Sequence, residues 1–403
     1  NAKGMNKGVT RLLVLSHSYI RDKDDYAGLF IHTLNKGLQG LNYRITVISP
    51  HASGLKTREE MDGIDVIRFR YMPDYLETLA YRGTMHDMVR KSIWKKFIFS
   101  CFILAFLFET IKTIFGKKIQ LVHSHWWFPC GFIAYLSYLL LRVPYVVTIH
   151  GTDARIIEGN FFLTWLFKLV LRRSYGVIVG SEYLKTVLET SLPEEDIKKL
   201  AIHKIPMPVE IPPISEINHL RREGNSILTV ARFTAQKNLK ILIEALMYLK
   251  EEGIMFSATI IGDGPLRTEL KQQISHSHLD NSIEMLSHVG RRDLFDHYRR
   301  CSFFVLPSLK EGLGLVLVEA LLMKETVIAS NSGGITEIIE DGVSGILFDP
   351  YNPRQLADEI KKLLQDPDLA KKLANNGFEK ARILFSIENV REKYSRVYQN
   401  SIN

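Results

Sequence analysis

The strongest constraint on the fold is an alternation of short apolar runs with longer helical patterns, which occurs twice along the chain. In the first half, the runs at 11–16 and 44–49 are almost continuously apolar and are bounded by turn residues. Such runs are typical of strands that are buried on both faces, as in a parallel sheet covered by helices. Further strands are expected at 66–70, 120–124, 145–149 and 177–180.

A proline-rich segment interrupts this alternation, which then restarts. Pro206, Pro208, Pro212 and Pro213 fall within eight residues, a density that neither a helix nor a central strand can accommodate. The sequence therefore predicts two βα domains joined by a hinge, which fits a chain of 403 residues. In the second half, strands are expected at 226–230, 257–261, 283–286, 303–306, 326–329 and 345–348, and helices at 238–252, 353–364, 367–384 and 387–399.

The net charge of +8 is unevenly distributed. Residues 1–205 carry 28 basic and 18 acidic side chains, whereas residues 206–403 carry 24 and 26. The basic half lacks the helix-turn-helix, zinc and aromatic signatures of nucleic-acid binding, so an anionic acceptor or membrane surface is the expected partner. The three cysteines cannot build a disulfide framework, and we read no signal peptide, so a cytoplasmic location is expected, with peripheral attachment to the inner face of the plasma membrane as the alternative to a fully dissolved protein.

The segment 307–320 combines a glycine-bearing turn with two glutamates. It reads Pro-Ser-Leu-Lys-Glu-Gly-Leu-Gly-Leu-Val-Leu-Val-Glu-Ala and joins an apolar strand to an apolar helix. Such a junction presents free backbone N–H groups to an anion. Glu311 lies in the turn, where it can reach a ligand. Glu319 lies inside the helix, where a buried carboxylate needs a hydroxyl or N–H partner, from either a sugar or the protein itself.

Two further turns of the second half are candidates for binding. Arg232 and Lys237 are five residues apart across the turn after strand 226–230, and both stay charged, so they can converge on one phosphate group. The alternative is two solvated cations. The turn 262–265 reads Gly-Asp-Gly-Pro. It lacks the third glycine and the later acid of a dinucleotide fingerprint.

These segments together resemble the retaining glycosyltransferases of the GT-B fold, the large GT4-type family called glycosyl transferases group 1. The resemblance rests on the spacing of Glu311 and Glu319, on Arg232 and Lys237, on the turn 262–266 and on the Gly-Gly turn of 332–339. It covers nearly all of residues 226–350. The first half matches more loosely, through Gly28, His125 and the segment 148–151.

The resemblance implies the fold: α/β, with two Rossmann-like doubly wound domains facing each other across a cleft. It assigns 1–205 to an N-terminal acceptor-binding domain and 206–385 to a C-terminal domain that binds a nucleotide-sugar donor. Residues 386–403 are expected to form a helix that returns to the N-terminal domain.

The resemblance also implies roles for individual residues. Glu311 contacts the transferred sugar, and Glu319 contacts the donor ribose. Lys237 and Arg232 hold the diphosphate and stabilise the leaving group, so no metal and no other cofactor is expected. The remaining donor contacts are implied for Gly28, Gly262, Gly264, Pro265, Gly312, Leu313, Gly314 and Leu315.

Histidines at strand ends are the candidates of the first half. His150 follows strand 145–149, and its family counterpart contacts the donor sugar, although a histidine so placed is often structural. His125 resembles an acceptor-side histidine. It alternates with His123 along one strand, and a two-histidine metal site there lacks a third ligand. The sequence Asp22-Lys23-Asp24 is a literal Asp-x-Asp, which we interpret as a solvated loop.

The segment 97–108 has one polar residue in twelve and is flanked by lysines. An apolar, aromatic helix with basic flanks can lie in a membrane interface, and Phe102 and Phe106 are then expected to contact lipid. The alternative is a helix that only covers the sheet. No apolar run reaches the roughly 18 residues needed to span a bilayer.

The function that these observations predict is sugar transfer from a nucleotide-diphosphate sugar, such as a UDP-, GDP- or ADP-sugar, to a hydroxyl of a glycan or lipid-linked acceptor. The resemblance implies transfer with retention of configuration, and we expect it to serve cell-surface glycan or glycolipid synthesis. The alternatives are a GT-B epimerase, a phosphorylase, and a non-catalytic two-domain sensor of sugars or nucleotides.

Overall fold

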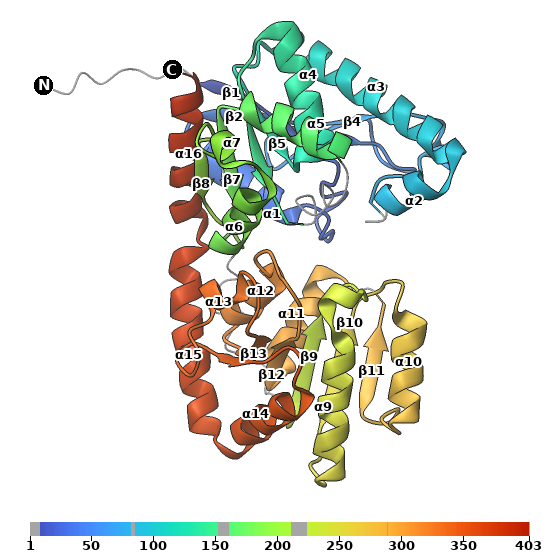
Figure 1. Ribbon diagram of the computed structural model, residues 1–403, viewed down its shortest axis with the longest axis vertical. Coiled ribbons are helices and arrows are strands. Elements are labelled where there is room, and N and C mark those ends of the chain that lie inside the picture. Colours follow the sequence, from blue (N-terminus) through green and yellow to red (C-terminus); the bar gives the residue numbers. More distant parts are fainter. Residues whose placement is uncertain (1–8, 82–84, 152–160, 211–223, 288, 403) are drawn as a thin grey trace, which may run out of the picture. The chain divides into compact units, whose positions relative to one another are not determined.

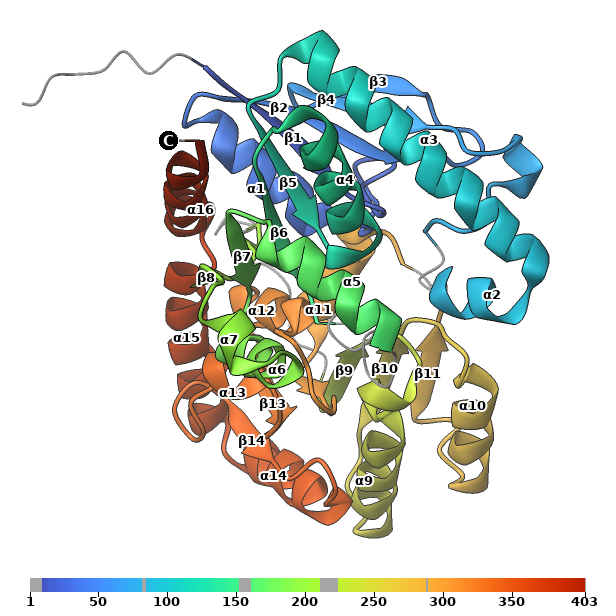
Figure 2. The same cartoon turned by 45° about the horizontal axis from the view of Figure 1, so that its top comes forward.

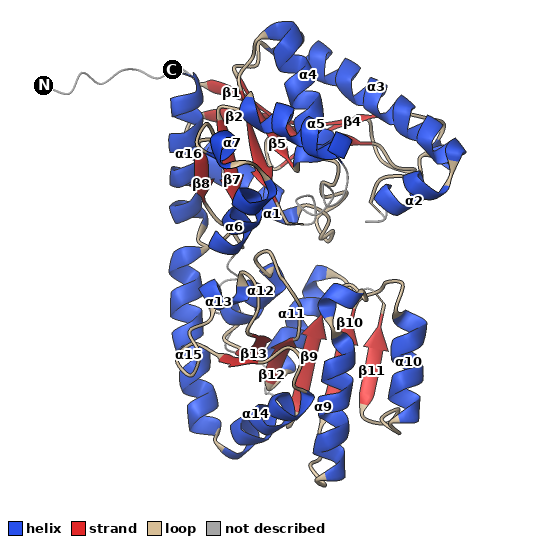
Figure 3. Cartoon of the chain, viewed as in Figure 1, coloured by secondary structure: helices blue, strands red, loops and turns tan. Residues whose placement is uncertain are grey.

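The computed structural model describes residues 9–81, 85–151, 161–210, 224–287 and 289–402. Its contacts divide the chain into two compact units, each built around one sheet (Figures 1 and 3). The N-terminal unit comprises Asn1–Gly180, Leu184–Pro208 and Ile387–Asn403, and the C-terminal unit comprises Ser181–Tyr183 and Val209–Ser386. Pro206 and Pro208 follow the last strand of the first unit, and Pro212 and Pro213 lie outside the described residues.

The sheet of the N-terminal unit has eight strands in the order β3-β4-β2-β1-β5-β6-β7-β8. All neighbours pair in parallel except β3 and β4. The central strands are fully buried, as their apolar runs predicted. The strands are β1 (Thr10–Leu15), β2 (Tyr43–Pro50), β3 (Arg58–Met61), β4 (Ile64–Phe69), β5 (Leu121–His125), β6 (Tyr145–Ile149), β7 (Gly176–Val179) and β8 (Ile202–Lys204).

Strand β3 is an element that the sequence analysis did not anticipate. It forms a hairpin with β4 through Asp62 and Gly63, which have φ of 50° and 76°. An Asp-Gly pair that adopts positive φ at both positions is a strong hairpin signal. The mixed polarity of Arg58–Met61 hid the strand, because an edge strand has no need of a continuous apolar run.

Helices cover the faces of this sheet, as expected for a doubly wound domain. The last helix, α16, packs on α1, where Ile387 approaches Gly37 so closely that a Cβ there would lie 2.3 Å from its side chain. The helices are α1 (Leu29–Gln39), α2 (Met85–Lys91), α3 (Ile93–Lys117), α4 (Phe132–Leu141), α5 (Phe161–Arg172), α6 (Glu182–Ser191), α7 (Glu194–Ile197) and α16 (Ile387–Ile402), with short turns η1 (Asp74–Leu76) and η2 (Trp127–Gly131).

The sheet of the C-terminal unit has six parallel strands in the order β11-β10-β9-β12-β13-β14. They are β9 (Ser226–Val230), β10 (Ser257–Ile261), β11 (Ile283–Leu286), β12 (Phe303–Leu306), β13 (Thr326–Ser330) and β14 (Ile346–Phe348). The helices are α9 (Leu239–Glu251), α10 (Arg267–His276), α11 (Arg291–Arg300), α12 (Leu315–Leu322), α13 (Ile335–Ile338), α14 (Pro353–Gln365) and α15 (Pro367–Leu384), with the short turn η4 (Ala235–Lys237).

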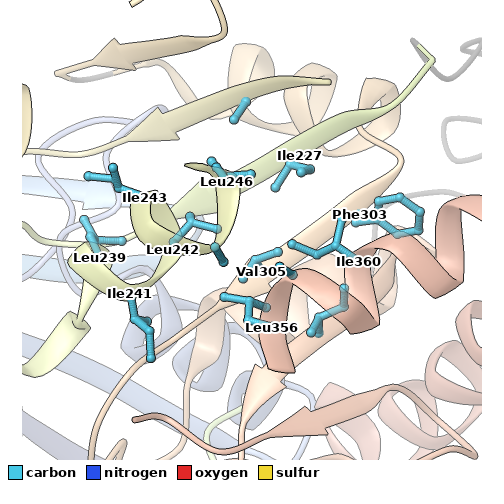
Figure 4. Close-up of a cluster of buried hydrophobic side chains, with 14 of the residues drawn as sticks. Ile227, Leu239, Ile241, Leu242, Ile243, Leu246, Phe303, Val305, Leu356 and Ile360 are labelled. Atoms are coloured by element: carbon cyan, nitrogen blue, oxygen red, sulfur yellow. The ribbon is translucent and has the colours of Figure 1, made fainter. Parts of the chain in front are cut away.

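The core of this unit lies between the sheet and helices α9 and α14. Leu242 and Leu246 of α9 lie in the same cluster as Val305 of β12 and Ile360 of α14 (Figure 4). Each of these four side chains is completely buried. The expected doubly wound α/β architecture is therefore confirmed in both units.

Helix α3 differs from the sequence analysis in length and in orientation. It has 25 residues, and by length and composition alone it is apolar enough to cross a membrane. Its longest uninterrupted apolar run is nevertheless shorter than the roughly 18 residues that span a bilayer. Phe102 and Phe106, which we expected to contact lipid, are both 0% exposed. They pack on Phe69 of β4, with ring centroids 5.0 and 4.5 Å apart. The expectation for these two residues is therefore wrong, because they form the face of α3 that covers the sheet.

Phe106 and Phe108, which are two residues apart on α3, are expected to differ sharply in how much their replacement lowers stability. Phe106→Ala removes a fully buried ring and should lower the free energy of unfolding by about 3–5 kcal/mol, because it leaves a cavity. Phe108→Ala, at a position that is 67% exposed, should change it by less than about 0.5 kcal/mol. Urea denaturation of the two variants tests the orientation of α3, and equal losses would contradict it.

Candidate functional site

The predicted binding residues of the C-terminal unit gather at one edge of its sheet. Strands β10, β9, β12 and β13 are neighbours and run parallel, so the turns that follow them meet at the carboxyl edge. Ligands of open α/β sheets bind at this edge. The turns carry Gly262, Gly264 and Pro265 after β10, Arg232 and Lys237 after β9, Glu311–Gly314 after β12, and Gly333 and Gly334 after β13.

Lys237 and Glu311 are brought into direct contact although 74 residues separate them. Lys237 Nζ donates to Glu311 Oε2 at 2.5 Å, and the two side chains are 18% and 13% exposed. Such a charge-assisted hydrogen bond holds both groups in place. The pair is accessible enough to meet a ligand and ordered enough to fix where a positive charge lies.

The backbone around Glu311 is held by its neighbouring turns. Leu309 N donates to Gln236 O at 2.7 Å, and Gly334 N donates to Glu311 O at 2.8 Å. Ser181 Oγ donates to Gly312 O at 2.6 Å. Because these bonds come from three separate segments, the Glu311 turn is fixed from several sides. Ser181 was missed by the sequence analysis, because nothing local to it signals a partner so distant in the chain.

Close contact between turns accounts for two glycines. A Cβ at Gly334 would lie 2.3 Å from Gly312 O, and a Cβ at Gly262, where φ is 144°, would lie 1.9 Å from Ala231 O. Neither position can accept a side chain without moving backbone. The expectation that Gly262 admits a ligand therefore has a competing explanation, since packing against Ala231 already requires glycine. The adjoining Gly264 and Pro265 lie in the same turn. The N–H of Phe233 donates a hydrogen bond to Asp263 O of this turn at 2.9 Å.

The N-terminus of α12 opens directly beside Glu311. Gly314, with φ of 80°, is the capping residue, and no side chain caps the helix. Gly312 and Leu313 lead into it, and Leu315 is its first residue. The first N–H groups of a helix and its positive dipole end favour an anion, so the structure combines a lysine and a helix N-terminus at one place.

Glu319 lies on α12, five residues beyond Gly314. Its Oε2 accepts a hydrogen bond from the Tyr298 hydroxyl at 3.2 Å. Burial raises the pKa of Glu319 to about 7, while the Tyr298 hydrogen bond and the charge of Arg291 act in the opposite direction. The protein itself thus supplies one partner, and the carboxyl group retains capacity for others. The sequence analysis missed Tyr298, which is 21 residues away on α11.

In the N-terminal unit, His125 and His150 share a hydrogen bond. His125 Nδ1 lies 3.0 Å from His150 Nε2, and the rings of Phe30 and Trp126 pack against His150. Burial lowers the pKa of His150 to about 3 and that of His125 well below its usual value. Both rings are therefore neutral at physiological pH and act as hydrogen-bonding groups rather than cations.

His125 is completely buried. It is 0% exposed and its Nδ1 is engaged with His150, so its acceptor-side role stays a prediction. His123 is equally buried and faces inward, with its Nδ1 2.7 Å from the hydroxyl of Tyr398 on α16 and its Nε2 2.8 Å from Thr148 Oγ1. Both ring nitrogens of His123 have protein partners, which disfavours a metal there.

Gly28 lies at the N-terminus of α1, with φ of 74°. A Cβ at this position would lie 2.4 Å from Ser18 O, in the loop after β1. In the same loop, Asp22 and Asp24 of the Asp-x-Asp sequence are exposed, whereas Asp25 is buried and pairs with Arg21 at 2.6 Å.

Among the described residues, one group has ligand atoms close enough for a metal: His51, Asp74 and Glu77, within 4.8 Å of one another. His51 Nδ1 is 2.5 Å from Glu77 Oε2, and its Nε2 is 2.8 Å from Leu55 O. Asp74 pairs with Arg70. Because each group already has a protein partner, this cluster is explained as a structural network.

Comparison with known families assigns each half of the chain. The family described as glycosyl transferases group 1 matches residues 210–380, and the one described as glycosyltransferase family 4 matches residues 27–201. An uncharacterised glycosyltransferase of Methanocaldococcus jannaschii is similar to the chain, with 33% identity over 66% of this chain and 71% of that protein.

Solved structures agree in fold. Sucrose-phosphate synthase of Thermosynechococcus elongatus has a TM-score of 0.79 at 19% identity. The superposition covers 97% of this chain and 98% of the synthase chain. Anabaena HepE in complex with UDP-glucose has a TM-score of 0.72 at 20% identity and covers 96% and 99%. These similarities confirm the GT-B fold expected from the sequence.

The raised pKa of Glu319 predicts a specific pH dependence of stability. The folded protein holds a proton that the unfolded chain releases between pH 4.5 and about 7. The contribution of Glu319 to the free energy of unfolding therefore falls as the pH rises through this window. Glu319→Gln should lack this decline in urea denaturation, and the exposed control Glu269→Gln should keep it. Parallel curves for the wild type and Glu319→Gln would contradict the assignment.

Proposed function

Because the chain belongs to the group 1 family of glycosyltransferases, we propose that it moves a sugar from a nucleotide-diphosphate sugar to an acceptor hydroxyl with retention of anomeric configuration. The acceptor is a glycan or a lipid-linked sugar of cell-surface glycan or glycolipid synthesis. The UDP-glucose bound by the structural neighbour HepE supports a donor of this class.

The observation that carries the proposal is the Lys237–Glu311 pair beside the N-terminus of α12. A diphosphate needs positive charge that persists at neutral pH, and Lys237 provides it at a fixed place. Arg232 follows the same strand and adds a second cation. The N–H groups at the start of α12 complete an environment for the leaving group. These protein groups take the part that a metal has in other transferases, so the proposed reaction is metal-independent.

Glu319 suits the ribose of the donor. A carboxylate accepts hydrogen bonds at two oxygens, and one of the two, Oε2, already accepts from Tyr298. A ribose diol would supply the further donors that a carboxylate among apolar residues requires. Glu311, which Lys237 orients, is then the proposed contact to the transferred sugar.

The proposed chemical step exchanges one glycosidic bond for another. The bond between the anomeric carbon and the diphosphate oxygen breaks, and the acceptor oxygen forms a bond to the same face of that carbon. The acceptor proton passes to the departing diphosphate. In the N-terminal unit, the neutral imidazole of His150 is proposed to hydrogen-bond a sugar hydroxyl, and His125 keeps that ring in position.

Replacing Lys237 should reduce turnover far more than replacing a neighbouring lysine. Lys237→Ala removes charge stabilisation of the leaving group and should lower kcat by about 10²–10³-fold. Lys240→Ala is the matched control, since Lys240 lies on α9 and pairs with Glu269 on the surface. Donor-dependent product formation measures both variants. Full activity of Lys237→Ala would refute the role of this lysine.

The same assay separates the proposed reaction from its alternatives. NMR of the product should show the anomeric configuration of the donor. Turnover of nucleotide sugar without acceptor would indicate an epimerase, and strict dependence on inorganic phosphate would indicate a phosphorylase.

Nucleotide binding is tested independently of turnover by thermal shift. UDP, GDP, ADP and their sugars are compared, and the cognate donor should raise Tm, since saturation at about 100 times Kd stabilises by about 2.7 kcal/mol. Lys237→Ala should weaken this shift, whereas Lys240→Ala should not. Binding without turnover on any acceptor would support a sensor, and no shift with any nucleotide would refute the proposed function.

A further inference from the structure

Helix α3 has two apolar faces, and only one of them has a partner in the described structure. The inward face packs on the sheet and consists of Ile98, Phe102, Phe106, Thr110, Thr113 and Ile114. The opposite face carries a second set of large apolar side chains that are more than half exposed: Ile93, Trp94, Phe97, Leu104, Phe108 and Phe115. Figure 2 shows α3 along the outside of the N-terminal unit.

The exposed side chains form one continuous stripe. Ile93, Phe97, Leu104, Phe108 and Phe115 are spaced alternately by four and seven residues, which places them on one line along a helix. At 1.5 Å per residue the stripe is about 33 Å long. Trp94 lies beside it and stacks on Phe97, with ring centroids 5.3 Å apart. A monomeric soluble protein seldom leaves such a patch uncovered.

A cationic pocket adjoins this stripe. It has a volume of about 350 Å³ and lies between α3 and the β3–β4 hairpin. Phe108 belongs to both the stripe and the pocket, while Arg58, Arg70 and Lys112 supply positive charge, of which that of Arg70 is offset by its ion pair with Asp74. Arg58 and Lys112 are 64% and 53% exposed, whereas the carboxylate with which both are paired, that of Glu109, is 14% exposed.

We propose that the outward face of α3 and this pocket dock on a lipid bilayer rich in anionic phospholipid. The helix lies in the plane of the interface with the stripe among the acyl chains near the headgroups, and the pocket receives a headgroup phosphate. Aromatic side chains beside lysine and arginine are the composition that an anionic membrane surface favours.

The charges argue against a second copy of the chain as the occupant. A symmetric dimer through the stripe would bring equivalent surfaces together, and Lys96 and Lys112, which are both exposed beside the stripe, would face cations of the same kind. Anionic headgroups instead complement these lysines, whose long stems allow the charge to reach them.

The inward face argues against a helix that crosses the membrane. α3 is long and apolar enough by composition, but Phe102 and Phe106 pack on Phe69 of the sheet. Withdrawing α3 into a bilayer would uncover Phe69 and other core residues. The buried contacts therefore keep the helix on the domain and leave only its outer face for lipid.

Vesicle flotation of the full chain tests the docking surface. We expect binding to vesicles of phosphatidylglycerol and phosphatidylcholine, and much weaker binding to phosphatidylcholine alone. Phe97→Ser with Phe108→Ser should lower the partition coefficient at least about tenfold. Arg58→Gln with Lys112→Gln should lower it about 25-fold on anionic vesicles and little on neutral ones.

The control removes exposed apolar side chains elsewhere. Met255→Ser with Tyr351→Ser changes two residues of the C-terminal unit that are at least as exposed, and binding should be unaffected. The Phe97→Ser, Phe108→Ser variant and the Met255→Ser, Tyr351→Ser variant should keep the wild-type Tm and circular dichroism, since their side chains lie at the surface. Arg58→Gln with Lys112→Gln leaves Glu109 without these two cations, so its circular dichroism is required to match the wild type before its flotation is compared.

Five outcomes would overturn the proposal. They are equal binding to neutral and anionic vesicles, unchanged binding of the Phe97→Ser, Phe108→Ser variant, and equal loss in the control. The fourth is protein that stays in the vesicles during carbonate extraction, which would indicate a spanning helix. The fifth is conversion of a dimer to a monomer by Phe97→Ser and Phe108→Ser without loss of vesicle binding, which would show that a second copy covers the stripe. None of these results depends on the identity of the sugar donor.

Discussion

The backbone contacts among the turns after β9, β10, β12 and β13 are the constraint on which the rest of the C-terminal site depends. Glu311 is joined through its carbonyl to Gly334 and through the adjacent Leu309 to Gln236. These contacts decide where the carboxylate of Glu311 lies, and hence where Lys237 is held. In the proposed reaction, a charge fixed in this way would stabilise a departing diphosphate without first reorganising.

The two units hold their polar groups by different means. In the C-terminal unit, Lys237 and Glu311 are ionic and remain partly exposed. In the N-terminal unit, His123, His125 and His150 are desolvated, and their pKa values are lowered so far that no charge develops at neutral pH. In the proposed function, the first arrangement would meet the charged diphosphate of the donor, and the second would meet neutral hydroxyl groups.

Helix α3 illustrates how one element serves two purposes. A helix that covers a sheet needs one apolar face, and the sequence of α3 is apolar around nearly its whole circumference. The apolar residues that the sheet does not bury form the outward stripe, which lowers solubility unless a partner covers it. The cationic pocket beside Phe108 indicates that the partner is anionic. The proposed contact with an anionic bilayer accounts for both the apolar stripe and the cationic pocket.

The sequence by itself determined the class of fold, because near-continuous apolar runs alternating with helical patterns have few other solutions. It placed helix 367–384 at its observed bounds, and it singled out Lys237, Glu311 and Glu319 as candidate site residues from their places at strand–helix turns and in the helix that follows, and from the family resemblance. Spacing along the chain is enough for such assignments when the residues follow parallel strands.

Only the tertiary structure decided which groups touch. It paired Glu319 with Tyr298, buried His125 behind His150, and turned Phe102 and Phe106 toward the sheet. These outcomes depend on contacts between segments far apart in the chain. An apolar helix with two possible inner faces has no preferred rotation of its own, so the surface of the sheet beneath it makes that choice.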